Sequence, residues 1–272
     1  MKRTSIKWVV LAAVVIAAVA IFLQIALRQE RADVFILCGS SMRQALGDVI
    51  QRYKEISGDT VMVTYGGSGD LATQLQTTGR GDIYIAHDPW ARWAEQKGLL
   101  EKWAGVAYLD LVIVIPQDNP KSIASLRDLT GAGLRLGAGD PEYSTSGVVF
   151  KHLIENLPYG EEIRKNVKKT GHGHQKRCTE VQMGSLDAGI VWNAAAHLFR
   201  EKLKSIPVSR GPIHAVTSPT FGRTDLSNIK LDVCLTKVAS ENNNESARRF
   251  FEFMVTQCKG VFVDHGFRAM EE

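Results

Sequence analysis

The chain has 272 residues, of which 44% are hydrophobic and 23% charged, the composition of a globular protein long enough for two lobes of ordinary domain size. Its formal net charge of +4 arises in the first 31 residues, which hold five Lys or Arg and one Glu. The remaining 28 basic and 28 acidic residues cancel, and they form no basic stripe, which argues against nucleic acid as a partner.

The first element in chain order is an apolar run of 20 residues, from Trp8 to Leu27, that only Gln24 interrupts. A run of this length spans a bilayer and exceeds the usual apolar core of a cleaved signal peptide. The alternative is a secreted protein cleaved near Ala18–Ala20. We expect residues 1–32 to be a signal anchor and linker, with the membrane span at 8–27. The basic residues before the run favour the cytoplasm, which places the rest of the chain outside it, on the periplasmic or extracytoplasmic face.

Short apolar runs then alternate with helical patterns. The predicted elements are a strand at Val34–Leu37, a helix at Met42–Ile56, a strand from Val61, a helix that includes Leu71 and Leu75, and a strand at Gly81–Ala86. Such a β-α-β-α-β series with apolar strands is typical of a parallel, doubly wound sheet covered on both faces. The next helix carries Trp90 and Trp93, whose three-residue spacing favours the core over a ligand platform.

Small polar turns join the first two strands to their helices. The first turn contains Ser40 and Ser41, and the second contains Ser68 within a cluster of glycines. A helix start presents free backbone N–H groups, and its dipole favours a negatively charged guest. Ser68 as a simple cap of its own helix is the alternative interpretation. Two parallel βα units side by side would direct both turns at one crevice beyond the carboxyl ends of their strands.

The βα pattern begins again beyond Tyr108–Pro116, which is long and almost wholly apolar. The predicted elements are a helix at Ser125–Leu129, strands at Leu134–Gly137, within 187–194 and at Ile229–Val238, helices at Val148–Asn156 and Glu245–Val255, and a connection at 207–228. The turn 139–147, with Ser144, Thr145 and Ser146, is a third hydroxyl-rich helix start. We therefore expect residues 33–113 and 229–272 to form lobe 1 and residues 114–228 to form lobe 2.

Several common catalytic motifs are missing from the sequence. The glycine clusters lack the features of a P-loop, a Gly-x-Ser-x-Gly elbow or a dinucleotide fingerprint. No acid and base stand at a recognisable spacing, so the hydroxyl-rich helix starts suit an anion better than a reaction. We expect no enzyme activity, no cofactor and no cation site, since His172 and His174 would need metal ligands that the sequence does not place. The basic cluster at 168–177 is either a solvated loop or an electropositive rim that attracts an anion.

Four cysteines in an exported protein permit disulfides, but their wide spacing indicates no pairing. Cys38 and Cys234 fall on predicted buried strands. We expect both to be thiols of the core.

Several segments of the chain, in this order, resemble the periplasmic solute-binding proteins of molybdate and tungstate transporters. They are residues 39–46, 65–72, 81–86, 114–120, 139–142, 186–192, 250–254 and 265–267. The resemblance covers about residues 33–268. It implies an α/β, two-lobed periplasmic-binding-protein fold, with two doubly wound sheets and a hinge, following the N-terminal transmembrane helix. It also implies a tetrahedral oxyanion, molybdate or tungstate, held between the lobes and delivered to an ABC transporter permease. We expect a monomer.

The resemblance also assigns binding residues. Family serines fall on Ser41 and Ser68, with Ser40 as an alternative register for Ser41. Where the family often has Val-Pro-Ala-Gly, this chain has Ser144-Thr145-Ser146-Gly147, which adds hydroxyls. Many members bind with a Tyr hydroxyl at the place of Trp192, whose indole N–H donates only and still suits an anion. The neighbouring Asn193 can also donate. The alternatives are another anion (sulfate, phosphate or a small organic anion) and an anchored enzyme or sensor domain on the same fold.

Overall fold

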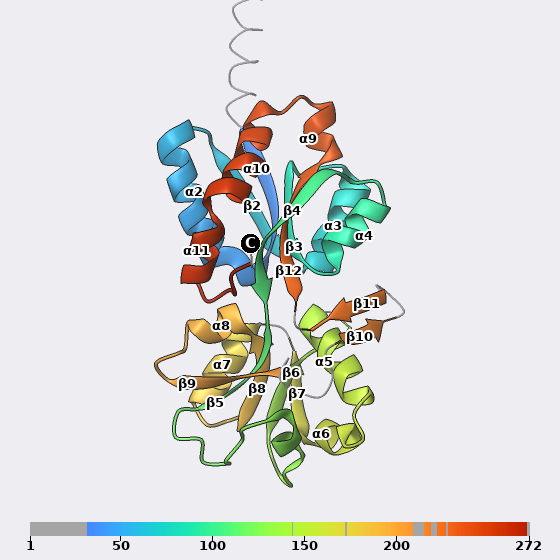
Figure 1. Cartoon of the computed structure of the whole chain (residues 1–272), viewed down its shortest axis with the longest axis vertical. Coiled ribbons are helices and arrows are strands. Elements are labelled where there is room, and N and C mark those ends of the chain that lie inside the picture. The colour runs from blue at the N-terminus through green and yellow to red at the C-terminus, as the bar shows by residue number, and fades with distance from the viewer. Residues whose placement is uncertain are drawn as a thin grey trace, which may run out of the picture.

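The structure is a computed structural model that describes residues 32–142, 144–171, 173–208, 215–218, 222–226 and 228–270. It consists of two α/β lobes stacked along the long axis, each built on a five-stranded mixed sheet (Figure 1). None of the helices in these ranges has both the length and the apolar character that a membrane span requires. The predicted anchor at 8–27 lies outside the described residues.

Lobe 1 has the strand order β2-β1-β3-β12-β4. Its strands are β1 (Val34–Gly39), β2 (Val61–Gly66), β3 (Ile83–His87), β4 (Leu100–Leu109) and β12 (Ile229–Thr236). Strand β1 pairs in parallel with β2 and β3, whereas β12 runs antiparallel between β3 and β4. Neighbouring residues of β1 such as Ile36 and Leu37 are both fully buried, because helices cover both faces of the sheet.

The helices of lobe 1 lie in two layers, with α2, α10 and α11 on one side of the sheet and α3 and α4 on the other (Figure 1). They are η1 (Ser40–Met42), α2 (Arg43–Ser57), α3 (Ser68–Thr78), α4 (Trp90–Gln96), α9 (Lys237–Glu241), α10 (Glu245–Gln257) and α11 (Lys259–Asp264). Helix α2 buries Ala45, Leu46, Val49 and Tyr53, a helical spacing, and ends where Gly58 adopts a left-handed conformation with a φ of 71°.

Lobe 2 has the strand order β7-β6-β8-β5-β9. Its strands are β5 (Leu111–Pro116), β6 (Leu136–Gly139), β7 (Val167–Gly171), β8 (Ala188–Trp192) and β9 (Leu203–Pro207). Its helices are η2 (Leu126–Thr130), α5 (Thr145–Glu155), α6 (Gly160–Asn166), α7 (His174–Gln182) and α8 (Asn193–His197). A small antiparallel hairpin, β10 (Ala215–Ser218) and β11 (Gly222–Asp225), contacts α5 beside the lobe boundary (Figure 1).

The chain crosses from lobe 1 to lobe 2 at Asp110, inside the apolar segment that the sequence presents as one element. Strand β4 ends at Leu109 and pairs with β12, whereas β5 begins at Leu111 and pairs with β8 and β9. The boundary expected after residue 113 therefore falls inside a strand of the second sheet. Buried strands of two different sheets have the same apolar composition, so only their pairing separates them.

Other expectations also differ from the structure. Helix α5 begins at Thr145 instead of 148, and residues 207–228 contain the β10–β11 hairpin. The sequence pattern predicts strand β4 only at its last residues, and it does not predict α6, β7, α7 and β9 as separate elements. All four cysteines are buried and unpaired, which agrees with core thiols at Cys38 and Cys234.

Candidate functional site

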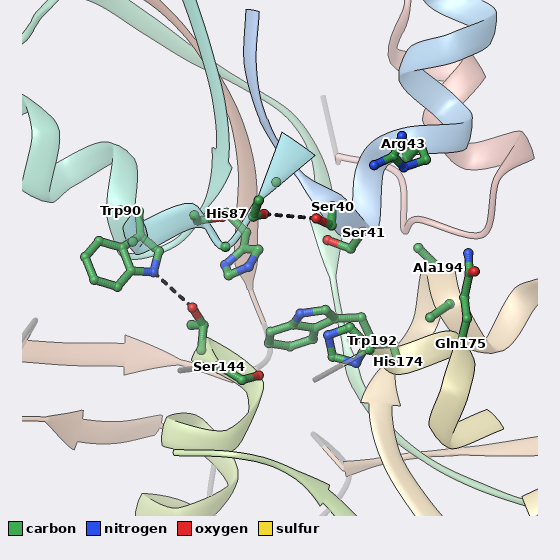
Figure 2. A pocket seen from close by; sticks show the side chains of 18 of the residues that line it. Ser40, Ser41, Arg43, His87, Trp90, Ser144, His174, Gln175, Trp192 and Ala194 are labelled. Atoms are coloured by element: carbon green, nitrogen blue, oxygen red, sulfur yellow. Dashed lines mark hydrogen bonds between the residues drawn. The ribbon is translucent and has the colours of Figure 1, made fainter. Parts of the chain in front are cut away.

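A cleft of about 650 Å³ lies between the two lobes. The carboxyl ends of β1, β2 and β3 reach it from lobe 1, and the carboxyl end of β8 reaches it from lobe 2. Helices α3, α5 and α7 begin at the cleft, so their first residues line it (Figure 2). Because helix starts carry unpaired N–H groups and the positive end of the helix dipole, this arrangement favours an anion.

The three predicted serines of lobe 1 all line the cleft, but their hydroxyls differ in availability. Ser40 is exposed and donates to the carbonyl oxygen of Gly66 at 3.2 Å. Ser41 is half-buried and donates to the sulfur of Met42 at 3.0 Å, a weak acceptor. Ser68 is only 4% exposed, and its Oγ has no hydrogen-bond partner among the described residues. A buried hydroxyl without a partner costs free energy, which makes Ser68 the strongest candidate for a ligand contact.

Of the three hydroxyl residues predicted for the site in lobe 2, two line the cleft and the third is buried behind them. Ser144 and Thr145 line the cleft, whereas Ser146 is fully buried and does not. The Oγ of Ser146 lies 2.9 Å from the Oγ of Ser144. Ser146 thus orients Ser144, the N-cap residue of α5, instead of facing a ligand.

Trp90 packs against a core cluster of lobe 1 together with Trp93, as their spacing predicted, and it also bridges the two lobes. Its Nε1 donates to Oγ1 of Thr145 at 2.9 Å, and its ring lines the cleft (Figure 2). The ring lies so close to the start of α3 that a Cβ on Gly69 would approach it to 2.6 Å. The sequence contains no local signal for this role, because a three-residue spacing only shows that both tryptophans share one helix face.

Trp192 lies at the carboxyl end of β8, lines the cleft and is only 1% exposed. Two imidazoles contact it, His87 from the end of β3 and His174 from the start of α7 (Figure 2). The ring centroids lie 5.3 Å and 6.1 Å from that of Trp192, respectively. Burial lowers the pKa of both histidines, and for His174 the nearby Arg177 and His87 add to this and bring its pKa to about 3. Both imidazoles are therefore neutral at pH 7.

Sequence reasoning missed His87 altogether and treated His174 only as a metal ligand or part of a basic loop. A signal for His87 was present, since it directly follows a predicted apolar strand, as Ser40 follows the first one. Within the described ranges no group of His, Cys, Asp and Glu is arranged to hold a metal ion.

Asn193, the last predicted site residue, does not line the cleft. Its Oδ1 accepts the backbone N–H of Asp110 at 3.1 Å, and its own N–H donates to the Asp110 carbonyl at 2.9 Å. The carboxylate of Asp110 also accepts hydrogen bonds from Arg268 at 3.2 Å. Asn193 therefore anchors the crossing between the lobes.

Arg177 belongs to the predicted basic cluster, yet it is neither in a solvated loop nor on a rim. It is only 4% exposed, and its guanidinium donates to three backbone carbonyls in lobe 2. These carbonyls belong to Ile190, Ala138 and Gly171. Arg177 thus ties α7 to the sheet beneath it.

The cleft combines hydroxyl groups, N–H donors and aromatic rings between two α/β lobes, which defines a solute-binding protein of the two-lobed class. A family model for bacterial extracellular solute-binding proteins matches residues 34–268, and the chain belongs to this family.

Individual relatives agree with this assignment. By sequence, the chain is similar to the molybdate-binding protein ModA of Escherichia coli (strain K12), with 24% identity over 247 residues, 88% of this chain and 90% of that protein. By structure, it is similar to the periplasmic molybdate-binding protein of Azotobacter vinelandii, with a TM-score of 0.66, 14% identity and coverage of 88% and 100%. It is also similar to the sulfate-binding protein SubI from Mycobacterium tuberculosis H37Rv, with a TM-score of 0.66, 17% identity and coverage of 88% and 87%. These structural likenesses show the two-lobed fold.

Proposed function

We propose that this protein captures a tetrahedral oxyanion, molybdate or tungstate, in the interlobe cleft. It delivers the anion to an ABC transporter permease from the periplasmic face of the membrane, to which residues 8–27 anchor it. The observation that carries this proposal is the Oγ of Ser68, which is buried at the start of α3, at the wall of the cleft, without a partner in the described structure.

The donors around the cleft support an anion of high charge density. Lobe 1 supplies the hydroxyls of Ser41 and Ser68 and the first N–H groups of α3. Lobe 2 supplies Ser144, the first N–H groups of α5 and the indole of Trp192. Converging neutral donors hold a dianion without a cationic partner, and hydrogen bonds to a charged group are stronger than neutral ones. Since both lobes contribute, the anion would hold them together.

Sulfate is the second candidate. One support is the structural likeness to a sulfate-binding protein. The other is the turn at 144–146, where this chain has hydroxyl side chains in place of the Val-Pro-Ala common in the molybdate-binding family. Sulfate and molybdate would bind to the same donors. Which of the two binds more tightly therefore depends on the size of anion that the closed cleft accepts.

A titration followed by intrinsic fluorescence tests the proposal, because Trp90 and Trp192 line the cleft. The purified protein is titrated with molybdate, tungstate, sulfate and phosphate. We expect saturable binding, tightest for molybdate or tungstate, that Ser68→Ala weakens and that Ser185→Ala, an exposed serine on lobe 2, leaves unchanged. Absence of binding by all four anions would contradict the proposed function, and sulfate as the tightest ligand would favour the second candidate.

A further inference from the structure

Two histidines, one from each lobe, flank Trp192 at the cleft (Figure 2). Neither imidazole has a side-chain carboxylate as a hydrogen-bond partner among the described residues. Histidines in a site for an anion matter because the protonated ring is a cation with two donors, whereas the neutral ring offers one donor and one acceptor.

The hydrogen bond of His87 determines which of its two ring nitrogens carries the proton in the neutral form and which can only accept a hydrogen bond. Its Nδ1 lies 2.9 Å from the backbone carbonyl oxygen of Asp88. A carbonyl can only accept, so Nδ1 carries the proton. In the neutral ring, Nε2 is then left with a lone pair, which repels an oxyanion. His87 becomes a donor to an anion only when Nε2 takes up a proton.

His174 is placed less favourably for a positive charge. Its Nδ1 is buried without a partner in the described part of the chain. The guanidinium of Arg177 lies close enough to oppose protonation of His174, and its own donors are directed at backbone carbonyls. Protonation of His174 would therefore place a positive charge beside the guanidinium of Arg177, which is always charged.

The charged surroundings of His87 are different. The carboxylate of Asp88 accepts the backbone N–H of Lys230 at 3.1 Å and favours a charged His87. Around the cleft, Arg43 stacks on the ring of Tyr65 at 3.8 Å, and His265 pairs with Asp48 at 2.8 Å. The remaining ionisable groups that line the cleft are Asp70, Glu142 and His174.

We propose that the oxyanion binds together with one proton from solvent, which Nε2 of His87 takes up and then shares with the anion as a hydrogen-bond donor. This inference rests on the proposed function. Without the anion, burial keeps His87 neutral, because an unpaired cation in the protein interior is unfavourable. The bound dianion reverses that balance, since a nearby opposite charge favours the charged form of the imidazole. His174 stays neutral beside Arg177.

Isothermal titration calorimetry with molybdate at pH 8 measures this proton directly. The same titration is run in two buffers with very different ionisation enthalpies, and the difference in observed enthalpy gives the number of protons bound. Molybdate itself stays a dianion at this pH, so any proton is taken up by the protein. We expect uptake approaching one proton, and an apparent Kd that rises up to about tenfold per pH unit between pH 7 and 9.

Two matched variants locate the proton. We expect His87→Gln to bind molybdate more weakly and with no proton uptake, whereas His174→Gln retains the uptake. Uptake that persists in His87→Gln would overturn the assignment. Molybdate binding by the wild-type protein with no proton uptake, and with a Kd that is flat in pH, would overturn the proposal while the proposed function stands. Failure of every oxyanion to bind would instead remove the proposed function, and this inference with it.

Discussion

Asp232 provides a quantitative test of the energetics of lobe 1. It lies in β12 next to an irregularity in the pairing with β4, is fully buried, and neither carboxylate oxygen has a partner in the described structure. Burial is the main cause that raises the pKa of Asp232 to about 7, and the nearby charge of Asp88 adds to it. The folded protein therefore holds this carboxyl group protonated at mildly acidic pH.

The sign of the pH dependence follows from the two pKa values. In the unfolded chain the carboxyl group loses its proton near the ordinary aspartate pKa of 3.8, whereas in the folded protein it loses it near 7. Between these values the folded state binds more protons, so the free energy of unfolding falls as the pH rises. Since one pKa unit corresponds to about 1.36 kcal/mol, the loss approaches about 4 kcal/mol by pH 8.

Asp232→Asn removes the charge and keeps the shape of the protonated side chain. We expect urea unfolding of the variant and the parent to give similar stabilities at pH 3.5 or below, where the unfolded chain also holds the proton. At pH 8 the variant should be more stable by up to about 4 kcal/mol. Asp118→Asn, a change at an exposed carboxylate, is the control and should leave the parent's pH dependence intact. The same difference between Asp232→Asn and the parent at both pH values would refute the reasoning.

Three further changes test the site and its support. Ser68→Ala should weaken oxyanion binding by roughly ten- to a hundredfold in a fluorescence titration, the effect of one hydrogen bond to a charged group, with no loss of stability, because the Ser68 side chain caps nothing. An unchanged Kd would exclude Ser68 as a ligand contact. Trp90→Phe removes the hydrogen bond to Thr145 across the lobes and should weaken oxyanion binding about two- to tenfold. Small-angle X-ray scattering should then show that the ligand-free variant is more open than the parent. Identical scattering of the two proteins would count against a bridge by Trp90. Arg177→Met leaves three carbonyls without their donor and should lower the free energy of unfolding by about 3 kcal/mol in urea; unaltered stability would show that water replaces the guanidinium.

Much of the local structure follows from the sequence alone. The runs around Ile36 and Ile85 are apolar over consecutive residues, which is the pattern of strands covered on both faces. Glycine and serine follow the strands that begin at Val34 and Val61, and a helical period begins directly after them, so the turns at Ser41 and Ser68 and their helix starts were predictable. Because such turns follow the carboxyl ends of parallel strands, their convergence at one crevice was predictable too.

Other features depend on contacts between residues far apart in the chain. Periodicity shows that Leu109 and Leu111 are buried, but only strand pairing places them in different sheets with Asp110 between them. The same holds for the site, where His87 and Trp90 from lobe 1 meet Trp192 and Thr145 from lobe 2. A sequence pattern reports how apolar a segment is and which of its residues share a face. It does not show which distant segment covers that face, because that depends on how the two lobes pack in the tertiary structure.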